Sequence, residues 1–239
     1  MADTGSPVDG PMPVPGDVTE KDFEELKDRC KVTMILFEAD PSQAHTDSSL
    51  RRFLKAFGDV DVAFKQLLKC NKWRREFGVA KLTPEDEDVM NELAAGKVHI
   101  LRQRDSKGRP VVHVAARKHN VYERDIDKFT RFIVYILETA CKKCNEDVID
   151  SLCIIFDLKG FTLSCMDYQF IKNLIWLLSK NYPERLGICL IINSPMMFSG
   201  CWAAIRPWLN DVTASKVRFV ADDLDLCKFV HPDALPPDD

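Results

Sequence analysis

The sequence lacks the short motifs that mark several large enzyme classes. It contains no G-x-S-x-G, no H-E-x-x-H, no G-x-x-x-x-G-K-[ST] and no G-x-G-x-x-G. These absences argue against a hydrolase with a nucleophile elbow, a zinc protease, a P-loop protein and a dinucleotide-binding enzyme. We therefore expect a protein that is not an enzyme and that uses no cofactor.

An excess of positive charge and a long apolar run are also missing. The chain has 33 Lys and Arg against 37 Asp and Glu, a formal net charge of −4, so no broad positive field points to nucleic acid. The uncharged stretch between Arg185 and Arg206 is as long as a membrane span, but Asn193, Pro195 and Gly200 interrupt it. The first residues do not resemble a secretory signal. We expect a soluble, cytoplasmic protein whose nine cysteines are reduced.

Composition divides the chain into three parts. Residues 1–18 are rich in proline and glycine and are predicted to form a flexible tail. Residues 19–90 show apolar side chains at helical spacing and predict a helical segment, with Thr19 as the cap of its first helix. Residues 91–239 are predicted to form the main domain.

The third part alternates β-type runs with amphipathic helices. The runs at 98–101 and 111–115 are joined by a turn-rich connector and predict a hairpin. The remaining expected elements are strands at 152–156, 188–192 and 217–220, and helices at 126–140, 167–181, 195–206 and near 222–229. Strands that alternate with helices favour an α/β fold in which helices cover a mostly parallel sheet.

Two pairs of residues carry side chains that could bind a metal or take part in redox chemistry. His99 and His113 are expected near each other on the hairpin, and Cys141 and Cys144 form a single C-x-x-C at a helix end. A zinc site needs two further ligands at a matching spacing, and none is evident. We expect no metal site.

The apolar segment at 196–209 is the most unusual part of the sequence. Its two adjacent stripes are Phe198, Trp202, Ile205 and Leu209, and Met197, Cys201, Ala204 and Trp208. A helix that is apolar nearly all round is either buried or meets something apolar outside the fold. Periodicity leaves both interpretations open: a core helix capped by Ser194, or a mobile helix that covers a cavity and enters a bilayer.

Thr213 and Lys216 follow on a predicted loop before the last strand. A hydroxyl group and an ammonium group at this spacing could hold a phosphate together. A solvated lysine on a loop is the alternative.

An ordered series of short segments runs from about Ser49 to Pro236. The segments are LRRFLKA at 50–56, WRREF at 73–77, DSKGRPV at 105–111, FDLKG at 156–160, YPERLG at 182–187, IINSP at 191–195, PWL at 207–209 and Thr213-x-x-Lys216. Together they resemble the CRAL-TRIO family of lipid-binding domains, especially its phosphatidylinositol-transfer type.

This resemblance implies a sheet that floors an apolar lipid pocket and a gate helix that covers it. The gate would lie at about Met196 to Leu209 and meet the membrane through Phe198, Trp202, Ile205 and Trp208. Thr213 and Lys216 would hold a headgroup phosphate, supported by Glu184. A simple ion pair of Glu184 with Arg185 or Lys216 remains the alternative.

The sequence departs from the family pattern at two places. The family has an Arg-Lys pair after the alanine that matches Ala56, whereas this chain has Phe57 and Gly58. Members that also carry phosphatidylcholine have hydroxyl side chains where this chain has Leu152 and Ile154. Apolar side chains cannot donate to a phosphate, so phosphatidylcholine exchange is not expected.

These observations lead to one functional expectation and two alternatives. We expect a monomeric lipid-binding and lipid-transfer protein that takes a phospholipid, favouring phosphatidylinositol or a phosphoinositide, from membranes that it visits transiently. The alternatives are a carrier of another hydrophobic ligand such as a sterol, tocopherol or retinoid-like molecule, and a membrane-recruited adaptor that senses lipid without transfer. Two basic faces are expected to orient the protein on anionic lipid: Lys65, Lys69, Lys72 and Arg74, and Lys97, Arg102, Arg104 and Arg109.

Overall fold

The computed structural model describes residues 18–36 and 45–237, so the tail expected at 1–18 lies almost wholly outside the described residues. The chain forms two compact units. Unit 1 contains the residues up to Ala80 together with Lys172–Glu184, and unit 2 contains Lys81–Ile171 and the residues from Arg185 onward. Helix α6 (Tyr168–Asn181) begins in unit 2 and continues into unit 1.

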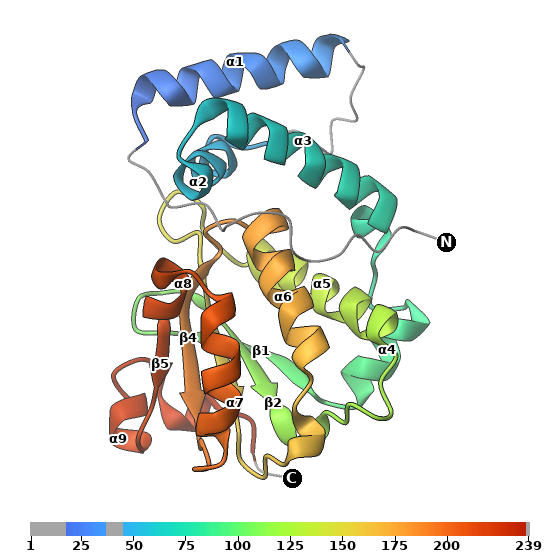
Figure 1. The fold of residues 1–239 in the computed structure, drawn as a ribbon, viewed down its shortest axis with the longest axis vertical. Coiled ribbons are helices and arrows are strands. Elements are labelled where there is room, and N and C mark those ends of the chain that lie inside the picture. Colours follow the sequence, from blue (N-terminus) through green and yellow to red (C-terminus); the bar gives the residue numbers. More distant parts are fainter. Residues whose placement is uncertain (1–17, 37–44, 238–239) are drawn as a thin grey trace. The chain divides into compact units, whose positions relative to one another are not determined.

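Unit 1 is helical, as its apolar spacing predicts (Figure 1). Its other main helices are α1 (Glu20–Leu36), α2 (Asp47–Phe57) and α3 (Val60–Phe77), followed by the short 3-10 helix η2 (Val79–Lys81). The backbone N–H of Asp22 donates to Thr19 Oγ1, and the N–H of Thr19 donates to Asp22 Oδ2, each at 3.2 Å. These two bonds form the expected cap of the first helix. Three helices share one apolar core: Phe23, Leu26, Leu50, Phe53, Leu54, Phe57, Ala63, Leu67 and Cys70.

Unit 2 is built on a five-stranded sheet in the order β1-β2-β3-β4-β5. The strands are β1 (Val98–Arg104), β2 (Pro110–Ala115), β3 (Leu152–Asp157), β4 (Leu186–Ile192) and β5 (Val217–Phe219). Strand β1 pairs antiparallel with β2, and every other pairing is parallel. The hairpin and the mostly parallel sheet expected from the sequence are therefore confirmed.

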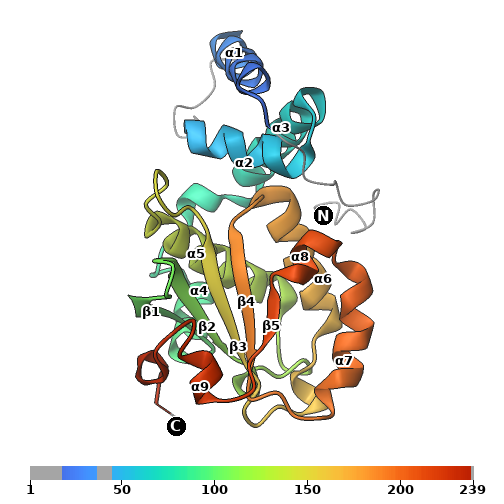
Figure 2. The ribbon, with the colours of Figure 1, turned by 90° about the vertical axis from the view of Figure 1, so that its left-hand side faces the viewer.

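The helices of unit 2 precede, connect or follow these strands. They are α4 (Glu87–Ala94), α5 (Ile126–Lys142), α7 (Phe198–Ile205), α8 (Asp211–Ser215) and α9 (Asp223–Leu226), with short 3-10 helices η3 (Ala116–Lys118), η4 (Leu163–Cys165), η5 (Arg206–Trp208) and η6 (Pro232–Ala234). Because parallel strands that follow one another in chain order are joined by right-handed crossovers, their connecting helices lie on one face of the sheet. Figure 2 shows α7 and α8 on that face and α9 on the other.

The face under α9 is a closed hydrophobic core. Its strand residues are joined by Leu226 and Val230, which are 2% exposed, and by Phe229 and Leu235 from the chain after the last strand. The part of the chain that follows β5 therefore covers this face of the sheet.

Asp157 is the last residue of β3, and its carboxylate interacts with β2, with the turn after β3 and with the residue that follows β4. Its Oδ1 atom accepts hydrogen bonds from the backbone N–H of Lys159 at 2.9 Å and from Asn193 Nδ2 at 2.8 Å. His113 Nε2 lies 3.5 Å from its Oδ2 atom. Burial by itself raises the pKa of Asp157, but the interactions with His113, Asn193 and Lys159 outweigh it and lower that pKa to about 2.

A buried ion pair lies over Gly187 of β4. Arg109 Nε donates to Asp105 Oδ2 at 2.6 Å, and both residues are buried. A Cβ atom at Gly187 would lie 2.7 Å from both Arg109 Cδ and Ser151 Oγ. The glycine of the YPERLG segment is thus required for space.

We predict that Gly187→Ala destabilises the protein, because the added methyl group must displace the paired and buried Arg109. The expected loss in unfolding free energy is about 1–3 kcal/mol, measured by chemical denaturation. The control is Gly200→Ala in α7, where an added Cβ meets nothing within 4 Å and helix propensity favours alanine by about 1 kcal/mol. Equal stabilities of the Gly187→Ala variant and the wild type would contradict the packing described.

A second prediction concerns acid stability. The pKa of Asp157 is lowered from 3.8 to about 2 in the folded protein, so the charged form stabilises the fold above the unfolded pKa. That contribution, about 2 kcal/mol, is lost as the pH falls from about 4 to about 2. Unfolding free energies of the wild type and Asp157→Asn, measured from pH 6 to pH 2, should converge over that window. A constant difference would show that the charge of Asp157 is not the source.

Candidate functional site

The sheet face opposite α9 is apolar from β2 to β5. The row nearest the carboxyl ends of the strands consists of Val114, Phe156, Ile191 and Phe219, paired in register. Ile191 is buried, whereas Val114 and Phe156 are only half-buried and Phe219 is 45% exposed. Interior strands of a parallel sheet are normally covered on both faces. Here the covering layer leaves part of an apolar floor accessible.

Helix α7 covers this floor at β5. The rings of Phe198 and Trp202 lie 6.3 and 5.4 Å from the ring of Phe219, and Phe198 also meets Phe161 at 5.4 Å. Phe198 and Ile205 are buried, and Trp202 is half-buried. The sequence analysis did not single out Phe219. The pattern that could have revealed Phe219 is its spacing from Val217: residues two apart in a strand point to the same face of the sheet, so both lie on this face.

The helix begins later than expected. The prediction that Ser194 caps it is wrong, because α7 starts at Phe198 and Met197 stands at the N-cap without a side-chain hydrogen bond. The N–H of Phe198 donates to the carbonyl of Pro195 at 2.9 Å, so residues 195–198 form a turn that precedes the helix. The expected interruption at Arg206-Pro207 is present, since α7 ends at Ile205 and a 3-10 turn follows.

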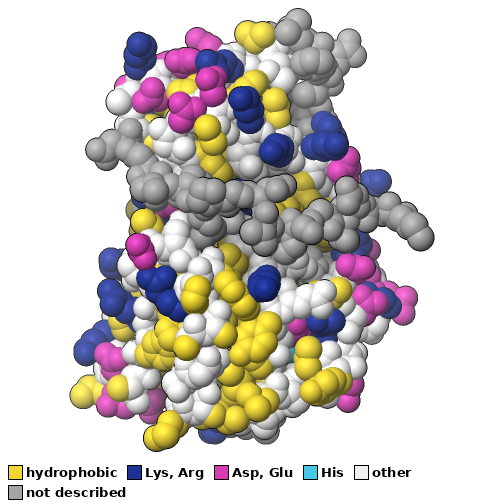
Figure 3. Space-filling model, in the orientation of Figure 1, with side chains coloured by type: hydrophobic (Ala, Val, Ile, Leu, Met, Phe, Trp, Pro, Cys, Tyr) yellow, Lys and Arg dark blue, Asp and Glu magenta, His cyan; other side chains and the backbone are white. Residues whose placement is uncertain are grey.

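The outer side of this segment is also apolar. Met196 is 93% exposed and Met197 is 48% exposed, and Ala203 and Ala204 of α7 face solvent. Figure 3 shows hydrophobic side chains gathered over α7 and beside it. The helix therefore combines a buried apolar side with an exposed apolar side and carries no charged residue.

Trp208 lies beyond α7 and meets the first residue of α6. Its ring is 5.9 Å from that of Tyr168 in an edge-to-face arrangement. The pKa of Tyr168 is raised, chiefly by its hydrogen bond to Cys201 of α7. Tyr168 thus contacts both α7 and η5, which the sequence analysis did not predict.

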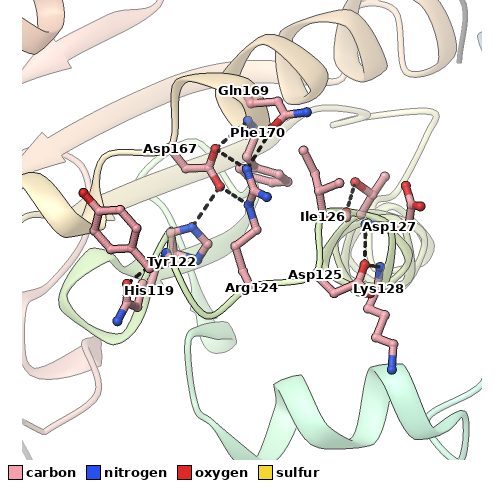
Figure 4. A network of polar contacts seen from close by, with 12 residues as sticks. His119, Tyr122, Arg124, Asp125, Ile126, Asp127, Lys128, Asp167, Gln169 and Phe170 are labelled. Atoms are coloured by element: carbon pink, nitrogen blue, oxygen red, sulfur yellow. Dashed lines mark hydrogen bonds and ion pairs between the residues drawn. The ribbon is translucent and has the colours of Figure 1, made fainter.

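A polar network fixes the chain just before Tyr168 (Figure 4). Arg124 donates to both oxygens of Asp167, at 2.6 and 3.1 Å, and His119 Nε2 lies 3.2 Å from Asp167 Oδ2. The N–H of Phe170 donates to Asp167 Oδ1 at 2.9 Å, so Asp167 caps α6. Burial raises the pKa of Asp167, but the hydrogen bond from Arg124 and the other bonds lower it overall. This network holds the start of α6 in place.

Thr213 lies in a short helix, and Lys216 follows that helix as its C-cap. The prediction of a loop is wrong for Thr213, because α8 spans Asp211–Ser215 with Asn210 as its N-cap. Asn210 Oδ1 accepts the N–H of Thr213 at 2.7 Å, and the N–H of Lys216 donates to the Thr213 carbonyl at 3.1 Å. Both residues are half-buried. The overlooked signal was Asn210 followed by Asp211, an N-cap with an acid in the first turn.

Glu184 belongs to unit 1, whereas Thr213 and Lys216 belong to unit 2. Its Oε2 atom lies 3.4 Å from the Nζ atom of Lys55, and its side chain is 16% exposed. The backbone of Glu184 has φ of 57°, a left-handed conformation that costs a non-glycine residue about 1–2 kcal/mol. A strained backbone beneath a largely buried carboxylate is a feature more typical of functional positions than of simple turns.

One of the expected basic faces is smaller than predicted. Arg109 is buried against Asp105, so it cannot contact a membrane, and this part of the prediction is wrong. Lys97 Nζ lies 2.8 Å from Glu92 Oε2, with its side chain 15% exposed. By contrast, Lys65, Lys69 and Lys72 of α3 are exposed.

The other candidate ligands do not assemble into a metal site. His99 and His113 are paired across the hairpin, with ring centroids 6.3 Å apart. All nine cysteines are free thiols. Among the residues that the structure describes, no group of three metal-binding side chains comes together. Within the same residues, the helices are too short or too polar to cross a membrane.

Comparison with known proteins gives several matches. The family model described as the CRAL/TRIO domain matches residues 94–238. A CRAL-TRIO domain-containing protein of Schizosaccharomyces pombe is 33% identical over 197 residues, covering 79% of this chain and 44% of that protein. A SEC14 cytosolic factor of Yarrowia lipolytica is 31% identical over 225 residues, covering 87% and 45%. A phosphatidylinositol transfer protein, CSR1, of Eremothecium gossypii is 29% identical over 207 residues, covering 80% and 46%.

The chain therefore spans less than half the length of these three relatives. The crystal structure of Sfh5 superposes with a TM-score of 0.67, at 17% identity, over 85% of this chain and 81% of that one, which supports the fold. The match over 94–238 includes the whole sheet, α7 and α8. The chain belongs to the CRAL-TRIO family of lipid-binding and lipid-transfer domains.

Proposed function

We propose that this protein carries a phospholipid, with phosphatidylinositol or a phosphoinositide as the favoured cargo, in an apolar site between the sheet and α7. One observation supports this most: an uncharged helix with apolar residues on both sides lies over an apolar sheet face that is only partly covered. A helix that packs on a sheet with one side and faces solvent with the other needs only one apolar side. The second apolar side is useful where the helix leaves the protein and meets a bilayer.

The energetics favour exchange between two apolar surroundings. An acyl chain in water costs about 0.8 kcal/mol per methylene group, so a carrier must offer a site as dry as the membrane. The half-buried rings of Trp202 and Trp208 would move from the protein to the interface, which tryptophan prefers. The gate therefore opens at little cost on a membrane and at high cost in water.

The headgroup contact is assigned to Thr213 and Lys216, with Glu184 acting on the same headgroup by resemblance. A hydroxyl group and an ammonium group suit phosphate oxygens because charge-assisted hydrogen bonds are the strong ones. The protein would meet membranes transiently from the cytosol, consistent with relatives named as cytosolic factors.

A different hydrophobic cargo is the second candidate, and the end of α2 favours it. Phe57 is buried in the core of unit 1 and Gly58 ends α2 with φ of 68°, so neither position supplies a cation to a phosphate. Mass spectrometry of lipids that co-purify with the protein separates the two candidates. Phosphatidylinositol supports the first, a sterol or tocopherol supports the second, and absence of any lipid contradicts both. Binding without transfer between donor and acceptor vesicles would identify a sensor.

We expect Lys216→Ala to lower phosphatidylinositol extraction from vesicles about tenfold, since it removes a charge-assisted contact worth about 1.5–3 kcal/mol. The assay measures labelled phosphatidylinositol that remains with the protein after vesicles are pelleted. Lys142→Ala, an exposed lysine at the end of α5, makes the same charge change elsewhere in unit 2. If both variants extract like wild type, the headgroup assignment is wrong.

We expect the double variant Trp202→Ala/Trp208→Ala to bind vesicles several-fold more weakly, because two interfacial rings are lost. Co-sedimentation with vesicles of phosphatidylcholine and phosphatidylserine measures this. Tyr122→Ala is the control, since Tyr122 is 84% exposed in the loop before α5. Unchanged binding of the double variant would mean that both rings belong permanently to the protein interior.

A further inference from the structure

Helix α3 of unit 1 is packed on two sides and exposed along a third (Figure 1). The side that faces the core shared with α1 and α2 consists of Ala63, Leu67 and Cys70. A second side contacts α6: the ring of Trp73 lies 6.4 Å from that of Trp176, and Gln66 Nε2 donates to the Lys180 carbonyl at 3.1 Å. These contacts hold the helix in place and leave its remaining side to solvent.

The exposed side of α3 carries a row of cations. Lys65, Lys69 and Lys72 are exposed and follow one another at spacings of four and three, so they lie on one face of the helix. The whole helix has five Lys and Arg against two acids, whereas the chain has a formal net charge of −4. Positive charge is therefore concentrated on this face.

The two acids of α3 do little to neutralise the row. Asp61 is paired with Arg29 of α1, so its charge is already balanced within unit 1. Glu76 Oε1 lies 3.8 Å from Lys72 Nζ, with both side chains largely exposed, and ion pairs of this kind are weak. An anionic partner would thus meet a positive surface.

Two aliphatic side chains stand among these lysines. Leu68 is 39% exposed and lies between Lys65 and Lys72, and Val62 is 47% exposed and lies three residues before Lys65. Lysines mixed with exposed aliphatic groups are typical of helices that lie on membranes, where cations meet anionic headgroups and aliphatic groups enter the acyl boundary. Surfaces for single-stranded nucleic acid use exposed aromatic rings instead. This face therefore fits an anionic bilayer.

We propose that this exposed face of α3, consisting of Val62, Lys65, Leu68, Lys69 and Lys72, binds anionic lipid surfaces as a membrane contact of unit 1 that does not use α7. The inference goes beyond the proposed function, because adsorption needs headgroup charge and no bound cargo. Binding through this face falls as the salt concentration rises, since salt screens exposed charges.

The first experiment measures co-sedimentation of the full chain with vesicles of phosphatidylcholine alone and of phosphatidylcholine with phosphatidylserine. Lys65→Gln/Lys69→Gln should bind the phosphatidylserine vesicles about tenfold more weakly than wild type. Lys65→Arg/Lys69→Arg keeps both charges and should bind like wild type. Lys21→Gln/Lys31→Gln makes the same charge change at exposed positions of α1 and is the matched control. Thermal unfolding of each variant shows that the fold is retained.

The second experiment tests the aliphatic part of the face. Leu68→Ala should bind the phosphatidylserine vesicles about threefold more weakly, because fewer methylene groups enter the interface. Val32→Ala, at a 53% exposed position of α1, should bind like wild type. A labelled single-stranded oligonucleotide is titrated into the same variants to test the other class of anionic partner.

Phosphatidylserine binding by Lys65→Gln/Lys69→Gln equal to wild type would overturn the inference, as would wild-type binding that does not depend on phosphatidylserine or salt. A loss that the arginine variant does not restore, or that the α1 control shares, would also overturn it. Wild-type vesicle binding by Leu68→Ala, or a loss in the lysine variant confined to the oligonucleotide, would exclude the bilayer as the partner. Failure of the proposed function is distinct: no lipid co-purifies, while charge-dependent vesicle binding persists.

Discussion

Both faces of the parallel sheet in unit 2 are apolar, and both must be kept from water. One face is closed permanently, because the chain after β5 packs Leu226, Val230 and their neighbours onto it. The other face receives α7, which covers β5 through rings rather than through a dense aliphatic layer. The proposed function depends on this asymmetry: the sealed face stabilises the sheet, and the partly covered face is where we propose that the cargo binds.

The polar contacts of unit 2 hold the covering elements in position instead of forming a reactive centre. Asp157 connects the carboxyl ends of β2, β3 and β4, and Asp167 with Arg124 fixes the start of α6. Each carboxylate accepts several hydrogen bonds, and each has a lowered pKa. Groups held in this way stay charged at neutral pH and are poor general acids or bases.

Headgroup recognition is where this chain departs most from the pattern that its motifs suggest. Phe57 at the end of α2 is buried in the core of unit 1 and Gly58 ends the helix, so the proposed headgroup contact uses Lys216, which follows α8. Glu184 is ion-paired with Lys55 and sits on a strained backbone.

The sequence by itself determined the alternation of strands and helices, the hairpin and the uncharged helix near residue 200, because these follow from local periodicity and turn residues. It also indicated Thr213 and Lys216, but as a loop, because a five-residue helix has too little periodicity to be seen. Only the tertiary structure decided that Phe219 and Tyr168 meet the α7–η5 segment and that Arg109 is buried. Each of these depends on contacts between segments far apart along the chain, which no local pattern encodes.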